Sequence, residues 1–186
     1  MLDSDLQPVR GTFMINTVAR TEPANLPLAP KNPLPYRQQL KAVRVLHEAL
    51  RLCPPAGGTM RMLTQDIEVD GYRVEAGTFA VVAFYALHRD PALWDNPLTF
   101  DPDRFLPERS QGRSRWQYLP FGGGPRSCIG DHFAVLEATL ALATVVRNAH
   151  IESVSDDFPL ATPFTVIAAA PILATVRKRS DVSRFR

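Results

Sequence analysis

Proline constrains this chain more than any other residue, because its 17 prolines mark where regular structure has to stop. A proline lacks the backbone N–H that helices and central strands use, and the residue before it is pushed out of the helical region. Residues 1–33 carry prolines at short intervals with weak periodicity, so we expect an irregular leader there that matches no recognisable element. Residues 34–186 hold the stretches with clear periodicity and are expected to form one unit.

Two stretches without proline have the spacing of helices. Apolar residues recur at threes and fours from Gln38 to Leu52, and Cys53-Pro54-Pro55 ends that pattern. A second helix is expected from Asp131 to about Asn148, with a carboxylate at the positive end of its dipole. Strand signals are shorter, with Asp70-Gly71 as a two-residue hairpin turn. The expected strands are Thr59–Leu63, Asp66–Val69, Tyr72–Val74 and Thr78–Phe84.

The remaining segments are less regular. The run Phe79–Phe84 is continuously apolar, which predicts a buried strand. The long stretch from Arg89 to Pro120 lacks periodicity, but its aromatic residues indicate packing rather than disorder. The tail from Ile151 to Arg179 is expected to form paired strands around Pro163 and Pro171. Together these signals predict an α+β fold, mainly α with small β-sheets.

The composition is that of an ordinary globular chain and excludes several classes of function. The net charge is +2, and no basic run is interleaved with aromatic residues, so no nucleic-acid partner is expected. No segment reaches the about 18 consecutive apolar residues of a transmembrane helix, and the start lacks a secretory signal. We therefore expect a cytoplasmic protein with no transmembrane segment, in which Cys53 and Cys128 stay reduced.

The most informative segment surrounds Cys128, which follows three glycines and precedes the second expected helix. Glycines let a backbone approach a flat ligand closely, and the start of a helix favours a thiolate. Arg126 adds a positive charge that favours the thiolate or meets a carboxylate. A phosphate-binding loop is the competing interpretation, but no Gly-Lys-Ser/Thr follows the glycines. Zinc and iron–sulfur sites need several clustered ligands, whereas a lone thiolate suits a metal whose other ligands a porphyrin supplies.

The ten residues Phe121-Gly-Gly-Gly-Pro-Arg-Ser-Cys-Ile-Gly130 resemble the haem-binding signature of the cytochromes P450. The resemblance implies that Cys128 ligates the iron of haem b. It also implies cofactor contacts at other signature positions, namely Phe121, Gly122, Gly124, Arg126, Ile129 and Gly130. An inert buried cysteine behind a glycine loop is the alternative.

Residues upstream occur in the order that this family has. Glu48 and Arg51 are three apart on one face of the first helix, a spacing that alone indicates only a surface ion pair. In a P450, such a Glu-x-x-Arg pair joins an arginine downstream, here Arg104, in a structural ion network. Arg61 matches an arginine that contacts a haem propionate. His88 is expected to be a packing or hydrogen-bonded residue rather than a ligand.

The resemblance, which runs from about Leu34 to Arg179, implies a partial cytochrome P450 fold and a monooxygenase that inserts one oxygen atom of O2 into a small organic or lipophilic substrate. A ferredoxin or flavoprotein reductase would donate the electrons. The acid–alcohol pair that P450s use for proton delivery is not found in residues 1–35, so no catalytic residue is assigned. Substrate contacts are expected after the first helix and near a late hairpin tip, at Ala56, Gly57, Gly58, Thr59, Thr165 and Val166.

Two hypotheses of different class follow. In the first, the protein is a haem-thiolate monooxygenase. In the second, the chain is a truncated P450 remnant that binds haem weakly or not at all and has no turnover. A haem spectrum and product formation discriminate between them.

Overall fold

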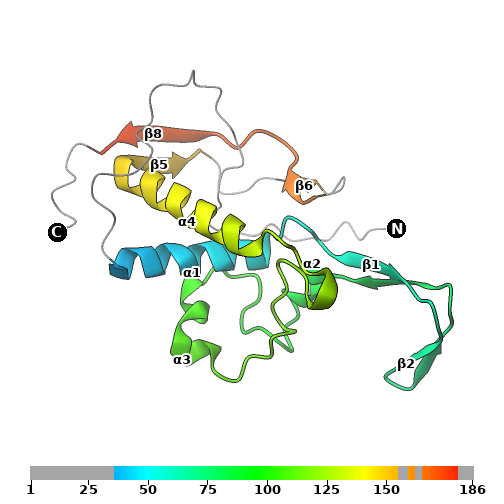
Figure 1. Cartoon of the computed structure of the whole chain (residues 1–186). Coiled ribbons are helices and arrows are strands. Elements are labelled where there is room, and N and C mark those ends of the chain that lie inside the picture. Colours follow the sequence, from blue (N-terminus) through cyan, green and yellow to red (C-terminus); the bar gives the residue numbers. More distant parts are fainter. Residues whose placement is uncertain (1–35, 155–158, 162–164, 180–186) are drawn as a thin grey trace.

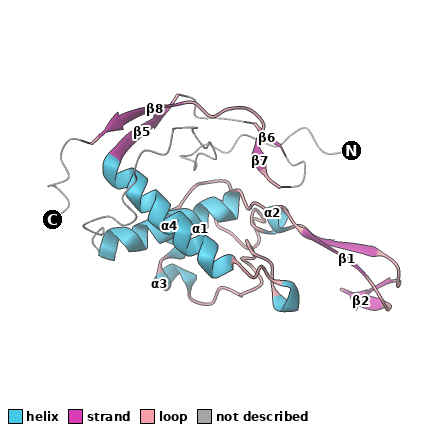
Figure 2. Ribbon diagram, turned by 45° about the horizontal axis from the view of Figure 1, so that its top comes forward, coloured by secondary structure: helices cyan, strands magenta, loops and turns pink. Residues whose placement is uncertain are grey.

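The computed structural model describes residues 36–154, 159–161 and 165–179. Two long helices, α1 (Tyr36–Leu52) and α4 (Asp131–Asn148), pack against each other (Figures 1 and 2). The other elements are short, and in chain order they are β1 (Thr59–Met62), β2 (Ile67–Val69), β3 (Tyr72–Val74), β4 (Phe79–Val82), α2 (Phe84–Leu87), the 3₁₀ turn η1 (Pro102–Phe105), α3 (Pro107–Ser110), the 3₁₀ turn η2 (Gly124–Arg126), β5 (Ala149–Ser153), β6 (Leu160–Ala161), β7 (Ile167–Ala168) and β8 (Ala174–Lys178). This confirms the predicted α+β fold with small sheets.

Both long helices match their sequence signals. α1 ends where predicted, since Cys53 N–H donates to Ala49 O at 2.7 Å and the two prolines then stop the helix. Its C-terminal half is buried, with Leu46 and Leu52 almost inaccessible, whereas Leu40 near its start is exposed. α4 begins at Asp131 and ends at Asn148, as expected.

The strands pair as antiparallel ribbons of two strands each within the described residues. β2 and β3 join through the predicted turn, in which Asp70 and Gly71 both have positive φ, at 51° and 80°. β1 pairs with β4, and Figure 1 shows this ribbon extending away from the helices. In the tail, β5 pairs with β8 and β6 with β7, as paired strands were expected there.

One expectation about burial is wrong. The run Phe79–Phe84 was expected to be a buried strand, but Phe79 and Val81 of β4 are 65% and 62% exposed. Only Phe84, at the start of α2, is buried. The ribbon that holds β4 has just two strands and extends from the body, so among the described residues little packs against its apolar side chains.

The irregular stretch between α2 and the cysteine loop is packed, as its aromatic residues predicted. Trp94 is 3% exposed and lies within an aromatic cluster that includes Phe105 and Tyr118. α1 makes its main contacts with η1 in this stretch and with α4. The cluster therefore fixes the stretch that leads into the cysteine loop.

Some expectations fall outside the described residues, namely the leader over residues 1–33 and Phe164 of the late hairpin. No helix in the described part of the chain is both long and apolar enough to cross a membrane.

Candidate functional site

The loop that carries Cys128 is closed by its own backbone. Cys128 N–H donates to Phe121 O at 2.9 Å, and Ser127 N–H donates to Gly124 O at 3.1 Å across η2. Gly122 and Gly124 have φ values of 73° and 74°, a region that side chains disfavour. The loop therefore needs glycine at these two positions, and it presents Cys128 as an exposed free thiol just ahead of α4.

Gly123 is required for a different reason, which the sequence analysis did not identify. Its φ of −159° is extended backbone that any residue adopts. A Cβ there, however, would lie 2.9 Å from a ring carbon of Trp116 and 3.2 Å from Leu119 Cδ2. The middle glycine thus lets the loop lie directly on these two side chains, and the tryptophan seven residues and the leucine four residues before it were the available signal.

A cavity of about 530 Å³ lies against this loop. It brings together eight of the predicted site residues, which come from two separate segments of the chain. Its lining contains Ala56, Gly58, Thr59, Arg61, Phe121, Gly122, Arg126 and Cys128, together with Pro55, Val82, Phe84, Trp116, Leu119, Pro120 and Gly123, which were not predicted.

Other predicted site residues do not line this cavity. Gly57 packs against Val166, whose Cγ2 would be 3.7 Å from a Cβ at the glycine, and Val166 N–H donates to Pro55 O at 2.8 Å. Thr165 is exposed. Ile129 is fully exposed directly after the cysteine, and a Cβ at Gly130 would be 4.0 Å from Cys128 Sγ. Gly124 begins the 3₁₀ turn η2.

Two guanidinium groups line the cavity, one from β1 and one from the cysteine loop. Arg61, in β1, donates from Nη1 to Thr59 Oγ1 and to Met60 O, both at 2.7 Å. Arg126 ends η2 and is exposed. No carboxylate in the described residues is recorded as their ion-pair partner. Both guanidiniums can therefore donate hydrogen bonds to an acidic group of a ligand.

The residues Glu48, Arg51 and Arg104 do not line the cavity but form a buried ion network. Arg51 meets Glu48 with two hydrogen bonds, from Nε at 2.8 Å and from Nη2 at 2.9 Å. Arg104 Nε donates to Glu48 Oε1 at 3.0 Å, and Asp101 N–H donates to the same oxygen at 2.9 Å. All three side chains of the ion network are at most 5% exposed, so one buried carboxylate lies between two buried guanidiniums.

Backbone carbonyls accept the remaining protons of the two guanidiniums. Arg51 donates from Nη1 to His88 O at 2.6 Å and to Pro97 O at 2.7 Å. Arg104 donates from Nη1 to Asp95 O at 2.9 Å, and both guanidiniums reach Thr99 O at 3.2 Å. The network thus fixes the irregular stretch between α2 and η1 to helix α1.

His88 connects this network to the cysteine loop. The side chain is fully buried, and its Nε2 accepts a hydrogen bond from Leu119 N–H at 2.8 Å. Burial lowers the pKa of His88 to about 4, so the ring is neutral. The sequence predicts a packing or hydrogen-bonded residue here but does not identify its partner.

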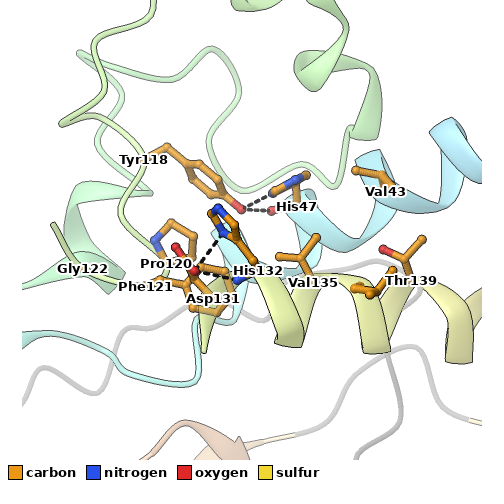
Figure 3. A pocket seen from close by; sticks show the side chains of 11 residues that line it. Val43, His47, Tyr118, Pro120, Phe121, Gly122, Asp131, His132, Val135 and Thr139 are labelled. Atoms are coloured by element: carbon orange, nitrogen blue, oxygen red, sulfur yellow. Dashed lines mark hydrogen bonds and ion pairs between the residues drawn. The ribbon is translucent and has the colours of Figure 1, made fainter. Parts of the chain in front are cut away.

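A second cavity, of about 600 Å³, lies on the α1–α4 side of the loop (Figure 3). His47 and Tyr118 line it and are bonded to each other: Tyr118 OH donates to His47 O at 3.0 Å and lies 3.0 Å from His47 Nδ1. Burial raises the pKa of Tyr118 and lowers that of His47. Asp131 and His132 line the same cavity, and Asp131 Oδ1 lies 2.8 Å from His132 Nδ1.

The cavity at Cys128 has the groups that a flat, acid-bearing cofactor needs. It offers a single exposed thiol, apolar walls and two guanidiniums. Within the described ranges, no cluster of three His, Cys, Asp or Glu side chains could hold a metal ion. The residues of this site therefore fit a cofactor of that kind, namely a haem, whose iron would need a thiolate and whose propionates would need cations.

Comparison with known proteins gives the family. The cytochrome P450 family model matches residues 33–174, and this chain belongs to that family. The chain is 48% identical over 120 residues to human cytochrome P450 4V2, an alignment that covers 62% of this chain and 23% of the relative. It is 53% identical over 102 residues to cyclooctatin synthase of Streptomyces melanosporofaciens, an alignment that covers 55% of this chain and 22% of the relative. The match thus spans less than a quarter of these curated relatives.

Solved structures agree in fold. The haem domain of cytochrome P450DA is 33% identical, with a TM-score of 0.69 over 74% of this chain and 30% of that one. Cyanobacterial CYP120A1 with bound retinoic acid is 27% identical, with a TM-score of 0.72 over 82% of this chain and 36% of that one. The chain therefore has a partial cytochrome P450 fold and belongs to a family of haem monooxygenases.

Proposed function

We propose that this chain forms the cysteine-bearing face of a haem-thiolate monooxygenase, with haem b in the cavity at Cys128. One observation carries the proposal: Cys128, Arg61 and Arg126 line the same cavity, although Arg61 comes from β1 and the others from the cysteine loop. A thiolate and two cations at the rim match the iron and the two propionates of a haem. We assign this role to residues 34–186.

Each predicted residue has a role in this proposal. Cys128 is the iron ligand, and Arg61 and Arg126 hold the propionates. Phe121 and Gly122 form the wall beside the ring, and Gly124 gives the loop its turn. Ile129 and Gly130 continue this surface toward α4.

The ion network has a structural role in the proposal. Glu48, Arg51 and Arg104 hold the irregular stretch in place through the carbonyls that the two arginines bind. No catalytic residue is assigned among the described residues.

When bound, haem supplies the activation of O2 and the insertion of one oxygen atom into an organic substrate. The residues of this chain would position the haem and the substrate relative to each other. The apolar side chains of Val82, Phe84 and Leu119 line the cavity assigned to haem and suit that cofactor. A small organic or lipophilic substrate is proposed from the family. A ferredoxin or flavoprotein reductase would supply the electrons. Substrate contacts are assigned to Ala56, Gly57, Gly58, Thr59, Thr165 and Val166.

The ligand assignment is tested by titrating the purified chain with haem, reducing it and adding carbon monoxide. Thiolate ligation gives a strongly red-shifted Soret band, and we expect this band in the unaltered chain. Cys128→Ser should abolish it. Cys53→Ser is the matched control, because Cys53 is half-buried at the end of α1, and it should keep the band. A band that survives in Cys128→Ser would overturn the assignment.

The propionate contacts are tested by affinity. Arg61→Leu and Arg126→Leu should each weaken haem binding by about tenfold or more, the loss expected for one charge-assisted contact. Arg73→Leu is the control, since Arg73 pairs with Asp66 on the exposed β2–β3 hairpin, away from the cavity. Product formation with a reductase and a panel of lipophilic substrates then distinguishes a monooxygenase from a haem binder without turnover.

A further inference from the structure

We propose that His88 is a positioning residue for Cys128: its ring Nε2 anchors the segment that leads into the cysteine loop. The proposal rests on the function proposed above, in which Cys128 is the iron ligand. It assigns no chemical step to the imidazole. The position of the Cys128 thiol depends instead on the hydrogen bond between Leu119 N–H and His88 Nε2.

His88 joins three parts of the molecule. Its own N–H donates to Phe84 O at 2.9 Å, which holds the residue at the end of α2. Its carbonyl oxygen accepts from Arg51 Nη1 at 2.6 Å, which ties it to the ion network of α1. Its ring Nε2 accepts from Leu119 N–H at 2.8 Å. The residue is 0% exposed, so water does not compete for these bonds.

From Leu119, two backbone hydrogen bonds connect the start of the loop to the backbone of Cys128. Leu119 O accepts from Gly122 N–H at 3.1 Å, and Phe121 O accepts from Cys128 N–H at 2.9 Å. The side chain of Leu119 also lies under the loop, 3.2 Å from where a Cβ of Gly123 would be. A shift of Leu119 therefore moves both the start of the loop and the wall beneath it.

The other ring nitrogen of His88 indicates why a histidine is present. Because Nε2 accepts a hydrogen bond from Leu119 N–H, the neutral ring carries its own proton on Nδ1. Nδ1 is buried and has no hydrogen-bonding partner among the residues that the structure describes. A buried, unpaired N–H costs free energy that a phenylalanine of similar shape would avoid. The bond at Nε2 is therefore the feature that favours histidine over an apolar ring.

Tyr118, the neighbour of Leu119, is held as well. Its hydroxyl bonds to the backbone and ring of His47 on α1 (Figure 3), and its ring lies 5.4 Å from that of His88. His47 of α1 fixes Tyr118, and His88 at the end of α2 fixes Leu119. The segment that enters the loop is therefore held from both helices.

The test uses the haem-free chain first. We expect His88→Phe, which keeps a ring but removes the acceptor, to speed hydrogen exchange at Leu119, Gly122 and Cys128 by about tenfold, the factor for one lost hydrogen bond. Amides of α1 report global stability and should change less. His88→Gln, whose side-chain oxygen can accept from Leu119, should restore slow exchange. His150→Phe, at an exposed histidine of β5, is the matched control.

Two outcomes would overturn the proposal: equal acceleration in the loop and in α1, or a His88→Gln chain that behaves as His88→Phe does. If His88→Phe does not fold, the unaltered chain decides. A through-bond nitrogen–nitrogen coupling between Leu119 N and His88 Nε2 is expected in ¹⁵N-labelled protein, and its absence refutes the bond.

The haem-loaded chain supplies the second readout. His88→Phe should convert a larger share of the reduced carbon monoxide complex to the unshifted Soret band, while His88→Gln keeps the red-shifted one; an unchanged share in His88→Phe contradicts the positioning role. If the unaltered chain shows no red-shifted band, the proposed function fails, whereas the exchange data still decide whether His88 anchors the loop.

Discussion

At the scale of single residues, the ion network has an excess of positive charge. Glu48 is the one carboxylate between Arg51 and Arg104, and all three side chains are almost fully buried. Removing charges from water is costly, and the cost is met only when partners and hydrogen bonds are complete. Here backbone carbonyls of the irregular stretch accept the hydrogen bonds that Glu48 does not accept from the two arginines. The buried charges therefore need the fold of that stretch, and that fold in turn needs the two guanidiniums.

We therefore expect Glu48→Gln to lower the free energy of unfolding by about 3–5 kcal/mol, because it leaves two buried guanidiniums without a counter-ion. Urea denaturation followed by circular dichroism measures this change. Glu152→Gln is the control, since Glu152 pairs with Arg177 at the exposed surface of the β5–β8 ribbon, and it should cost under about 0.5 kcal/mol. Similar losses in the two variants would contradict the charge argument.

The buried imidazole of His88 gives the chain a pH dependence. Burial lowers its pKa in the folded chain to about 4, below the ordinary value near 6.5. Between these two values the unfolded chain binds the proton and the folded chain does not, so stability falls as the pH drops through this window. The loss amounts to about 3 kcal/mol. Urea midpoints at pH 7 and pH 4.5 should differ more in the unaltered chain than in His88→Gln, and equal differences would contradict this expectation.

At the scale of elements, the cysteine loop depends on a close approach to the segment before it. Gly123 lies where a Cβ would meet Trp116 at 2.9 Å, and its backbone is extended, so only space excludes a side chain. We expect Gly123→Ala to cost about 1–3 kcal/mol of stability and to weaken haem binding. Gly123→Ala combined with Trp116→Phe removes the ring carbon that clashes and should recover most of the loss.

Gly112→Ala is the control for this prediction. Gly112 has a φ of 76°, but a Cβ there meets nothing within 4 Å, so the substitution adds backbone strain without a clash. It should lower stability by about 1 kcal/mol and leave haem affinity unchanged. If Gly112→Ala weakens haem binding as much as Gly123→Ala does, the packing argument fails.

Local chemistry allowed the elements to be predicted from the sequence. Pro54 and Pro55 end α1, and Asp70-Gly71 supplies the positive φ angles of the hairpin turn. The exposure of β4 could not be predicted, because an apolar run shows what a strand prefers to contact and not what is there to cover it. Likewise, the bond from Leu119 to His88 joins residues that no local pattern relates. The roles of the site residues remain predictions.

At the scale of the whole molecule, the described residues form only a small apolar core. The buried apolar residues are few, and they come from α1, α2, the irregular stretch and the late hairpin. In contrast, α4 contacts α1 on one side but has no buried residue of its own. A helix that is apolar all round is normally covered on all sides, so α4 presents apolar surface that nothing in the described residues covers.

This surface should be detectable in the folded chain. Phe133, Leu136 and Leu140 of α4 are 70%, 58% and 56% exposed. Exposed apolar patches bind the dye ANS, so we expect enhanced ANS fluorescence while the near-ultraviolet circular dichroism of the two tryptophans stays intact. The paired substitution Leu136→Lys and Leu140→Lys should lower this fluorescence several-fold, because it places two charges on the face. Leu98→Lys, at an isolated exposed leucine outside α4, is the control and should change it little. Fluorescence that is insensitive to the α4 pair would show that the dye binds elsewhere, for example on the exposed β1–β4 ribbon.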